Sequence, residues 1–120
     1  MVEVVQVDFK HIDERGKLIQ LVHEGYSQIN VLESKKGIIR GGHYHKKHIE
    51  AFYVISGEVE LTIKESLKIY KTVFREGDFF RILPNTTHSM FFTKDCIMVQ
   101  MYDSPVEDEN GQKDIIPDEI

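Results

Sequence analysis

Apolar and polar residues alternate in short runs along most of the chain, and these runs are rich in Val, Ile, Phe and Tyr. No window carries apolar residues at helical spacing for three turns. Alternation with a period of two is typical of a β-strand with one buried face. The pattern therefore predicts an all-β chain with strands at Lys17–Val22, Gln28–Leu32, Gly37–Gly41, His43–His45, Ala51–Ser56, Glu58–Lys64, Lys68–Phe74, Phe79–Ile82, Ser89–Phe92 and Cys96–Tyr102.

Turn-forming residues separate these runs. The Ser56-Gly57 pair stands between two of them and predicts a tight two-residue hairpin turn. Glu76–Asp78 and Pro84–Thr87 predict two further turns. Many short strands in a chain of 120 residues favour a β-sandwich or a small barrel.

The last part of the chain differs from the rest. Residues 1–103 carry the strand pattern, whereas residues 104–120 are mostly polar and acidic. Ile115 and Ile116 belong to this tail and would be exposed to water in a loose terminus. We therefore expect one barrel domain over residues 1–103, followed by a tail or an arm that packs on a neighbouring subunit.

Composition and charge exclude several classes of protein. The hydrophobic fraction of 41% can form one modest core, and beside it the charged fraction of 29% is too low for a disordered chain. The net charge of −5 argues against a nucleic-acid partner, which would require a basic surface. No apolar run approaches the roughly 20 residues that span a membrane, and the first residues do not form a secretory signal. The single Cys96 excludes an internal disulfide framework, so we expect a soluble, cytoplasmic protein.

Two histidines and a glutamate are spaced so that their side chains point the same way. Residues two apart share one face of a strand, so His43 and His45 project together. Glu50 opens the next strand on the same face as the apolar Phe52. Two imidazoles and a carboxylate would therefore point into an apolar interior, where unpaired polar groups are costly.

His88 is the natural fourth member of this cluster. It follows a Pro-Asn turn and shares its strand face with Met90 and Phe92. Three imidazole nitrogens and one carboxylate oxygen suit a transition metal more than Ca²⁺ or Mg²⁺. The set predicts a site for one divalent transition metal, such as Zn, Mn, Fe or Ni, with four ligands: His43, His45, Glu50 and His88.

The alternative to a metal centre is a metal-free polar site. The remaining histidines, His11, His23 and His48, have the ordinary interpretation of an isolated histidine, which is a surface or hydrogen-bonded residue. Cys96 is interpreted as a buried strand residue rather than a nucleophile, because no residue near it in the sequence would activate it.

The spacing of these residues resembles that of the cupin superfamily. Gly37, His43, His45, Glu50 and Gly57 occupy every fixed position of the first cupin motif. The resemblance implies a jelly-roll barrel, that is, a double-stranded β-helix of antiparallel strands with the four ligands inside. It also implies a homodimer, since cupins often form dimers by exchanging strands.

The second cupin motif is incomplete. Gly77 and His88 stand in register with it, but Leu83, Asn85 and Phe92 replace its Pro, Gly and Asn. His88 is the one residue of this motif that the metal needs.

Two stretches narrow the resemblance, Asp13–Leu18 and Gly37–Tyr44. They are similar to the dTDP-4-dehydrorhamnose 3,5-epimerases, the dTDP-4-keto-6-deoxyglucose 3,4-ketoisomerases and the cupin half of capsular-polysaccharide reductases. The Arg-Gly-x-His pattern of the first two groups carries over to Arg40 and His43, and the resemblance implies that His43 is the base. Those two groups generally work without a metal. The complete ligand set of this chain is closer to the capsular-reductase half, which holds one.

The resemblance implies an isomerase or epimerase that acts on a nucleotide-linked 4-keto-deoxysugar in polysaccharide biosynthesis. The base would remove the C3 proton, which the neighbouring ketone acidifies. A histidine bound to a metal cannot also be a free base, so His43 has one role or the other in a given state. Tyr102 and Tyr53 are the candidates for the catalytic acid, and the forked donors of Arg40 would bind the diphosphate or a sugar oxygen, with a surface salt bridge as the alternative.

Two other functions stay open at this point. A small Fe(II)-dependent dioxygenase would use the same ligands, and so would a non-enzymatic module that binds a sugar or a metal.

Overall fold

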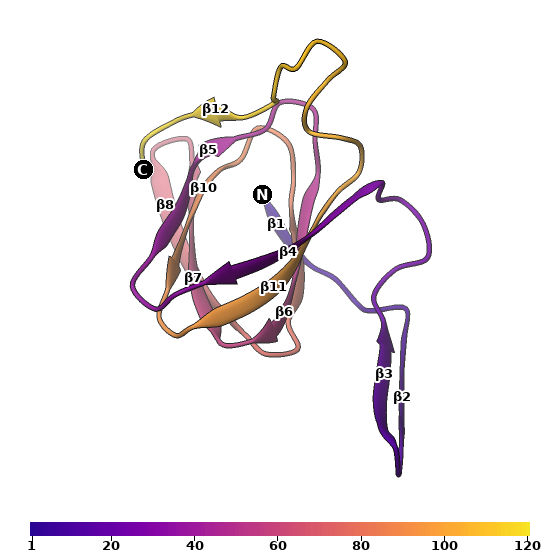
Figure 1. Ribbon diagram of the computed structural model, residues 1–120. Helices are drawn as coiled ribbons and strands as arrows, with labels where there is room; N and C mark the ends of the chain where they lie inside the picture. The colour runs from indigo at the N-terminus through magenta and orange to yellow at the C-terminus, as the bar shows by residue number, and fades with distance from the viewer.

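The computed structural model describes residues 1–120 and is built from β-strands alone (Figure 1). One five-stranded sheet has the order β1 (Val2–Val4), β9 (Phe79–Ile82), β6 (Glu50–Ser56), β11 (Cys96–Tyr102) and β4 (Gln28–Ser34). The other has the order β12 (Ile116–Pro117), β5 (Ile39–Tyr44), β10 (Thr87–Phe92), β7 (Glu58–Glu65) and β8 (Lys68–Arg75). All pairings are antiparallel, and the all-β prediction is confirmed.

A separate hairpin projects from the barrel formed by the two sheets (Figure 1), and its residue Ile19 packs against a small buried cluster of Ala51, Tyr53, Phe79 and Met101. It consists of β2 (Phe9–Asp13) and β3 (Gly16–Gln20), which pair only with each other. The sequence predicts the second of these strands but not the first. The structure contains no helix that is long and apolar enough to cross a membrane.

The core fills the space between the two sheets. Val59, Leu61 and Ile63 alternate along β7 and are buried, as the period of two predicts. Phe80, in the facing sheet, stacks against two other rings. The distance between ring centroids is 3.9 Å to Phe74 and 5.4 Å to Phe52. This apolar packing stabilises the barrel and makes its interior a place of low polarity.

The hairpin predicted at Ser56-Gly57 is wrong. β6 pairs with β9 and β11, whereas β7 pairs with β8 and β10, so the two strands lie in different sheets. Gly57 instead makes a corner at which the chain crosses from one sheet to the other. It has a φ of +92°, and a Cβ at this position would overlap the carbonyl oxygen of Asp95. A turn signal in the sequence indicates where the chain changes direction, but not which strand it pairs with next.

The two predicted strands around residue 41 form one strand, β5, that contains a bulge. The register between β5 and β10 shifts so that His88 pairs with His43 while Ser89 pairs with Gly41. Gly42 is the extra residue, and both glycines have positive φ, +96° and +77°. A Cβ on Gly41 would come within 2.8 Å of the carbonyl oxygen of His88. The bulge brings the backbones of the two histidines side by side.

The C-terminal tail packs against its own chain. β12 pairs with β5, with Ile116 opposite Tyr44 and Pro117 opposite His43. The amide of Asp118 donates to the carbonyl of Gly42 at 2.9 Å. The sequence predicts a tail or an arm onto a neighbouring subunit; in the structure, residues 116–117 of this tail extend the second sheet of the same chain.

Candidate metal centre

The four predicted ligands converge at one end of the barrel interior. His43 lies near the end of β5, His45 directly follows that strand, Glu50 is the first residue of β6, and His88 is the second residue of β10. Their ligand atoms all lie within 4.8 Å of one another. His45, Glu50 and His88 are almost completely buried, and His43 is partly exposed.

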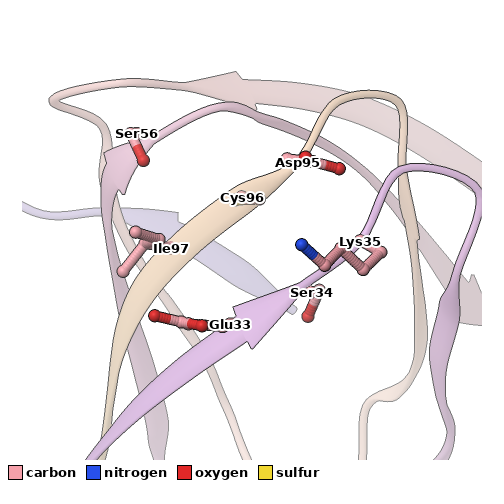
Figure 2. A pocket seen from close by; sticks show the side chains of 7 residues that line it. All are labelled: Glu33, Ser34, Lys35, Ser56, Asp95, Cys96 and Ile97. Atoms are coloured by element: carbon pink, nitrogen blue, oxygen red, sulfur yellow. The ribbon is translucent and has the colours of Figure 1, made fainter.

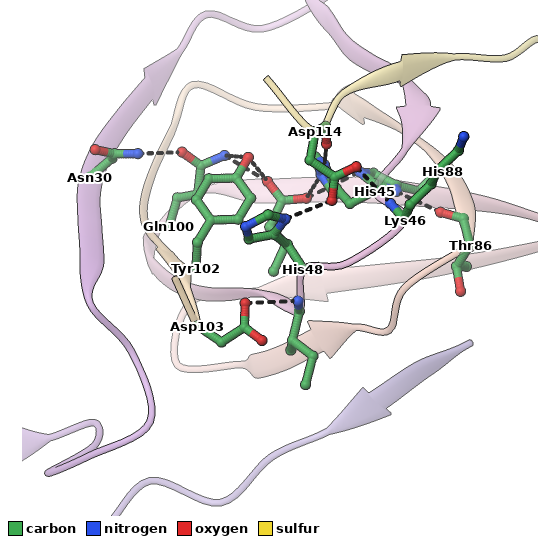
Figure 3. A network of polar contacts seen from close by, with 12 residues as sticks. Asn30, His45, Lys46, His48, Thr86, His88, Gln100, Tyr102, Asp103 and Asp114 are labelled. Carbon is green, nitrogen blue, oxygen red and sulfur yellow. Dashed lines mark hydrogen bonds and ion pairs between the residues drawn. The ribbon is translucent and has the colours of Figure 1, made fainter. Parts of the chain in front are cut away.

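The hydrogen bonds of two imidazoles fix which nitrogen carries the hydrogen. His45 Nδ1 donates to the carbonyl of Asp114 at 2.6 Å, and His88 Nδ1 donates to the carbonyl of Thr86 at 2.9 Å (Figure 3). In a neutral imidazole the other nitrogen, Nε2, then carries a lone pair. Both Nε2 atoms lie 3.1 Å from the same carboxylate oxygen, Glu50 Oε1.

His45 Nε2 forms a hydrogen bond with Glu50 Oε1, whereas His88 Nε2 does not. His88 Nε2 is fully buried and forms no hydrogen bond of acceptable geometry, although Glu50 Oε1 is close. A buried polar atom without a partner is costly, and a cation placed between these atoms would remove the cost. The residues present therefore fit a divalent transition metal bound by imidazole nitrogens and a carboxylate.

Burial and mutual contacts set the charges of the site. Burial and the two neighbouring imidazoles lower the pKa of His43 to about 4. Burial alone would raise the pKa of Glu50, but its contacts with His45 and His88 outweigh burial and hold that pKa well below its usual range. Near neutral pH the site therefore contains an anionic carboxylate and a neutral His43. Burial opposes protonation of His45, but its contacts with Glu50 and Asp114 outweigh burial and raise its pKa.

The second oxygen of Glu50 is held by a chain of polar side chains (Figure 3). Glu50 Oε2 accepts hydrogen bonds from Gln100 Nε2 at 2.7 Å and from the hydroxyl of Tyr102 at 2.9 Å. Gln100 Oε1 in turn accepts a hydrogen bond from Asn30 Nδ2 at 2.9 Å. Because Oε2 is engaged, Oε1 is the oxygen that faces the imidazoles. Gln100 and Asn30 were not predicted from the sequence; a polar residue on the inner face of an otherwise apolar strand is the pattern that could have indicated them.

The sequence of residues 11–110 matches a family described as the polysaccharide biosynthesis C-terminal domain. The chain belongs to this family. No curated protein matches it.

Several solved structures have a fold similar to that of this chain. QdtA, a sugar 3,4-ketoisomerase from Thermoanaerobacterium thermosaccharolyticum in complex with TDP, has a TM-score of 0.79 at 21% identity, over 96% of this chain and 86% of QdtA. A 3,4-ketoisomerase from Helicobacter canadensis has a TM-score of 0.81 at 19% identity, over 98% and 90%. The capsular polysaccharide assembling protein CapF from Staphylococcus aureus has a TM-score of 0.70 at 23% identity, over 93% of this chain but 34% of CapF. The predicted cupin barrel is confirmed.

The predicted substrate-binding residue, Arg40, lies on β5 away from the four ligands. Its Nε donates to Ser34 Oγ at 2.8 Å and its Nη2 donates to the carbonyl of Glu33 at 3.0 Å. These bonds join β5 to β4, and they are not the salt bridge considered as the alternative. Figure 2 shows a pocket of about 370 Å³ that is lined by these partners of Arg40 and by Ser56, at the end of β6 opposite Glu50. It is lined by Glu33, Ser34, Lys35, Ser56, Asp95, Cys96 and Ile97.

The three other histidines of the chain differ in their exposure and contacts. His11 and His23 are exposed and contact Asp13 and Asp8, as an ordinary surface interpretation predicts. His48 lies in the predicted loop but is buried, with an exposed fraction of 8%. Its two ring nitrogens contact Asp114 and Pro105, so His48 is a hydrogen-bonded residue rather than a surface one.

Proposed function

We propose that this chain is a cytoplasmic metal-binding enzyme that isomerises or epimerises a 4-keto-deoxysugar linked to a nucleoside diphosphate. The observation that carries the proposal is the convergence of His45 Nε2 and His88 Nε2 on Glu50 Oε1 inside a barrel of this family. QdtA has a similar fold and has been solved with TDP and with TDP-4-keto-6-deoxyglucose, which supports the substrate class.

The buried trio of His45, Glu50 and His88 would hold the metal, with His43 as a fourth ligand when its lone pair is not otherwise used. A bound divalent ion would polarise the sugar ketone as a Lewis acid. The trio brings two imidazole nitrogens and one carboxylate oxygen, and its buried position excludes competing water.

His43 is the proposed base. It is the most exposed of the four groups, and neither nitrogen of its imidazole forms a hydrogen bond. Its pKa of about 4 keeps the imidazole neutral near pH 7, so that a ring nitrogen can accept the C3 proton of the substrate. Delivery of this proton to C4 of the resulting enediolate would give the isomer, whereas epimerisation at C3 would require a second proton donor on the opposite face of the sugar.

The contacts of Tyr102 support a role in positioning Glu50 rather than the catalytic role predicted from sequence. Its hydroxyl is buried and already donates to the carboxylate. Burial, together with the charge of Glu50, raises the pKa of Tyr102. For Arg40, the guanidinium has one nitrogen, Nη1, without a hydrogen bond, and we propose that this donor binds a phosphate or sugar oxygen.

We also propose a homodimer. β4 is the edge strand of its sheet, and its outward-facing Ile29 and Val31 are 60% and 69% exposed. Exposed apolar residues along an unpaired strand edge favour association, and a second copy of the chain would cover them. Sedimentation of the purified protein as a monomer at micromolar concentration would overturn this part of the proposal.

The test is proton exchange at C3. The metal-loaded protein is incubated in D₂O with a dTDP-linked 4-keto-6-deoxysugar, and deuterium incorporation is followed by NMR. We expect exchange by the wild type, its loss in His43→Gln, and wild-type exchange in the control His11→Gln, since His11 is exposed and contacts only Asp13. Absence of exchange by folded, metal-loaded protein would overturn the proposal. Oxygen consumption by the Fe(II)-loaded protein without exchange would instead favour the dioxygenase.

Metal content is measured on the same preparations. His88→Ala should lower the amount of bound transition metal, because it removes a completely buried ligand. An unchanged metal content in His88→Ala would overturn the assignment of this ligand.

A further inference from the structure

A segment of the C-terminal tail runs along the stretch that carries two of the metal ligands. We call this segment, residues 114–118, the C-terminal clamp. Pro117 pairs with His43 in the sheet, and the amide of Asp118 donates to the carbonyl of Gly42. Asp118 Oδ2 also accepts a hydrogen bond from Thr87 Oγ1 at 2.6 Å, directly before His88. The clamp thus contacts both strands that present histidines to the site.

Asp114 is the residue of the clamp that forms a hydrogen bond with the imidazole of a candidate ligand. Its carbonyl accepts the hydrogen of His45 Nδ1 at 2.6 Å (Figure 3). That bond places a hydrogen on Nδ1 and points Nε2 at Glu50 Oε1, 3.1 Å away, where it could bind a metal. A ligand imidazole whose other nitrogen is held in this way is oriented and made more basic.

The side chain of Asp114 fixes the position of that carbonyl. Its carboxylate accepts hydrogen bonds from the amides of Lys46 and Lys47, at 2.9 and 2.8 Å, and lies 2.6 Å from His48 Nδ1. These three donors come from the loop that directly follows His45. One residue therefore holds the loop through its side chain and the ligand through its backbone.

We propose that Asp114 is a positioning residue of the metal centre, and that docking of the C-terminal clamp and metal binding are coupled. This inference rests on the metal site of the proposed function. Without the contacts of the Asp114 carboxylate, the carbonyl is no longer held against His45 and the imidazole is free to turn. Coupling of two binding events is reciprocal, so metal that binds more tightly to the docked state also favours docking.

The first test measures Zn²⁺ affinity by competition with a chromogenic chelator. Asp114→Ala should weaken binding by about 10- to 100-fold, the range found when a group that supports a metal ligand is removed. Asp114→Asn keeps one side-chain acceptor and should fall between this variant and the wild type. The matched control is Asp108→Ala, because the Asp108 carboxylate accepts bonds only from the amides of Asn110 and Gln112, within the tail.

The second test measures docking of the clamp rather than binding of the metal. Hydrogen exchange of the Asp118 amide, which donates to Gly42, reports whether the clamp is docked. Zn²⁺ should slow this exchange in the wild type and should have no effect in His88→Ala. A purely structural tail would give the same exchange with and without the ion.

The outcomes of these tests distinguish failure of the coupling from failure of the metal site. Wild-type affinity for Zn²⁺ in folded Asp114→Ala, or exchange of the Asp118 amide that Zn²⁺ does not slow in a wild type that binds the ion, would overturn the coupling alone. Failure of the wild type to bind Zn²⁺ would overturn the metal site and the coupling together.

Discussion

Gln100 donates a hydrogen bond of 2.7 Å from Nε2 to Glu50 Oε2, between the paired strands β11 and β6. The bond selects one oxygen of a buried carboxylate. With Oε2 engaged, Oε1 is left 3.1 Å from both His45 Nε2 and His88 Nε2. A neutral amide thus orients the single acidic group of the candidate metal centre.

Gln100→Leu should weaken metal binding. The substitution keeps the approximate size of the side chain but leaves Glu50 Oε2 with Tyr102 as its one remaining donor. Loss of a group that orients a ligand typically costs about 10-fold or more in metal affinity. The dissociation constant for Zn²⁺, measured by competition titration, checks this.

Asn30→Leu is the matched control for that variant. It removes the hydrogen bond that Gln100 Oε1 accepts, and it leaves both donors to Glu50 in place. Its effect on Zn²⁺ affinity should therefore be smaller than that of Gln100→Leu. If both variants bind Zn²⁺ as tightly as the wild type, Glu50 is oriented without the chain of amides.

Tyr102→Phe distinguishes positioning from acid catalysis. We expect weaker Zn²⁺ binding, because the hydroxyl that donates to Glu50 Oε2 is removed while the ring stays packed against the imidazole of His45. At saturating Zn²⁺ the rate of C3 exchange should return to that of the wild type. A rate that stays about 100-fold lower at saturating Zn²⁺ would instead assign Tyr102 to proton transfer with the substrate.

The convergence of the four candidate ligands could be predicted from sequence because local geometry places them. His43 and His45 are related by the two-residue period of a strand, Glu50 opens β6, and His88 is the second residue of β10. The groups that support these ligands could not be predicted in the same way. Asp114 lies 69 residues from His45 in sequence, and Gln100 lies 50 residues from Glu50. Contacts of this range depend on strand order, which a single sequence does not specify.

The long interior strands of the barrel could also be predicted from sequence, whereas the pairing of strands and the shortest strands could not. The alternation along β7 predicts its buried face correctly. β1 and β12 have three and two residues, too few to show a period, and their neighbours in the fold define them as strands. Asn85 replaces the glycine of the second cupin motif, and the structure explains this: its φ is +62°, a region that asparagine tolerates.

Gly57→Ala should destabilise the barrel strongly. Gly57 has a φ of +92°, and an added Cβ would overlap backbone atoms of Asp95 and Cys96, which cannot move without breaking the start of β11. Gly77→Ala is the matched control, since Gly77 has a φ of +88° with no atom within 4 Å of the added Cβ. Positive φ alone costs about 1–2 kcal/mol, and the overlap should add about 2 kcal/mol or more. Urea denaturation of both variants measures the difference, and equal free energies of unfolding would show that the corner can widen.

The contacts of Asp114 predict a stability that depends on pH in the acid range. Burial opposes ionisation, but the hydrogen bonds from His48 and from the amides of Lys46 and Lys47 outweigh it and lower the pKa of Asp114 from 3.8 to about 2. A carboxyl whose pKa is lower in the folded state stabilises that state above its unfolded pKa, and the stabilisation is lost as the pH falls from about 4 towards 2. Asp114→Asn cannot ionise, so the difference in free energy of unfolding between wild type and variant should shrink over this window, by at most about 2 kcal/mol. Urea denaturation of the metal-free proteins at about pH 6, 4 and 3 measures it. A difference that stays constant with pH would mean that the Asp114 carboxylate does not hold the loop after His45.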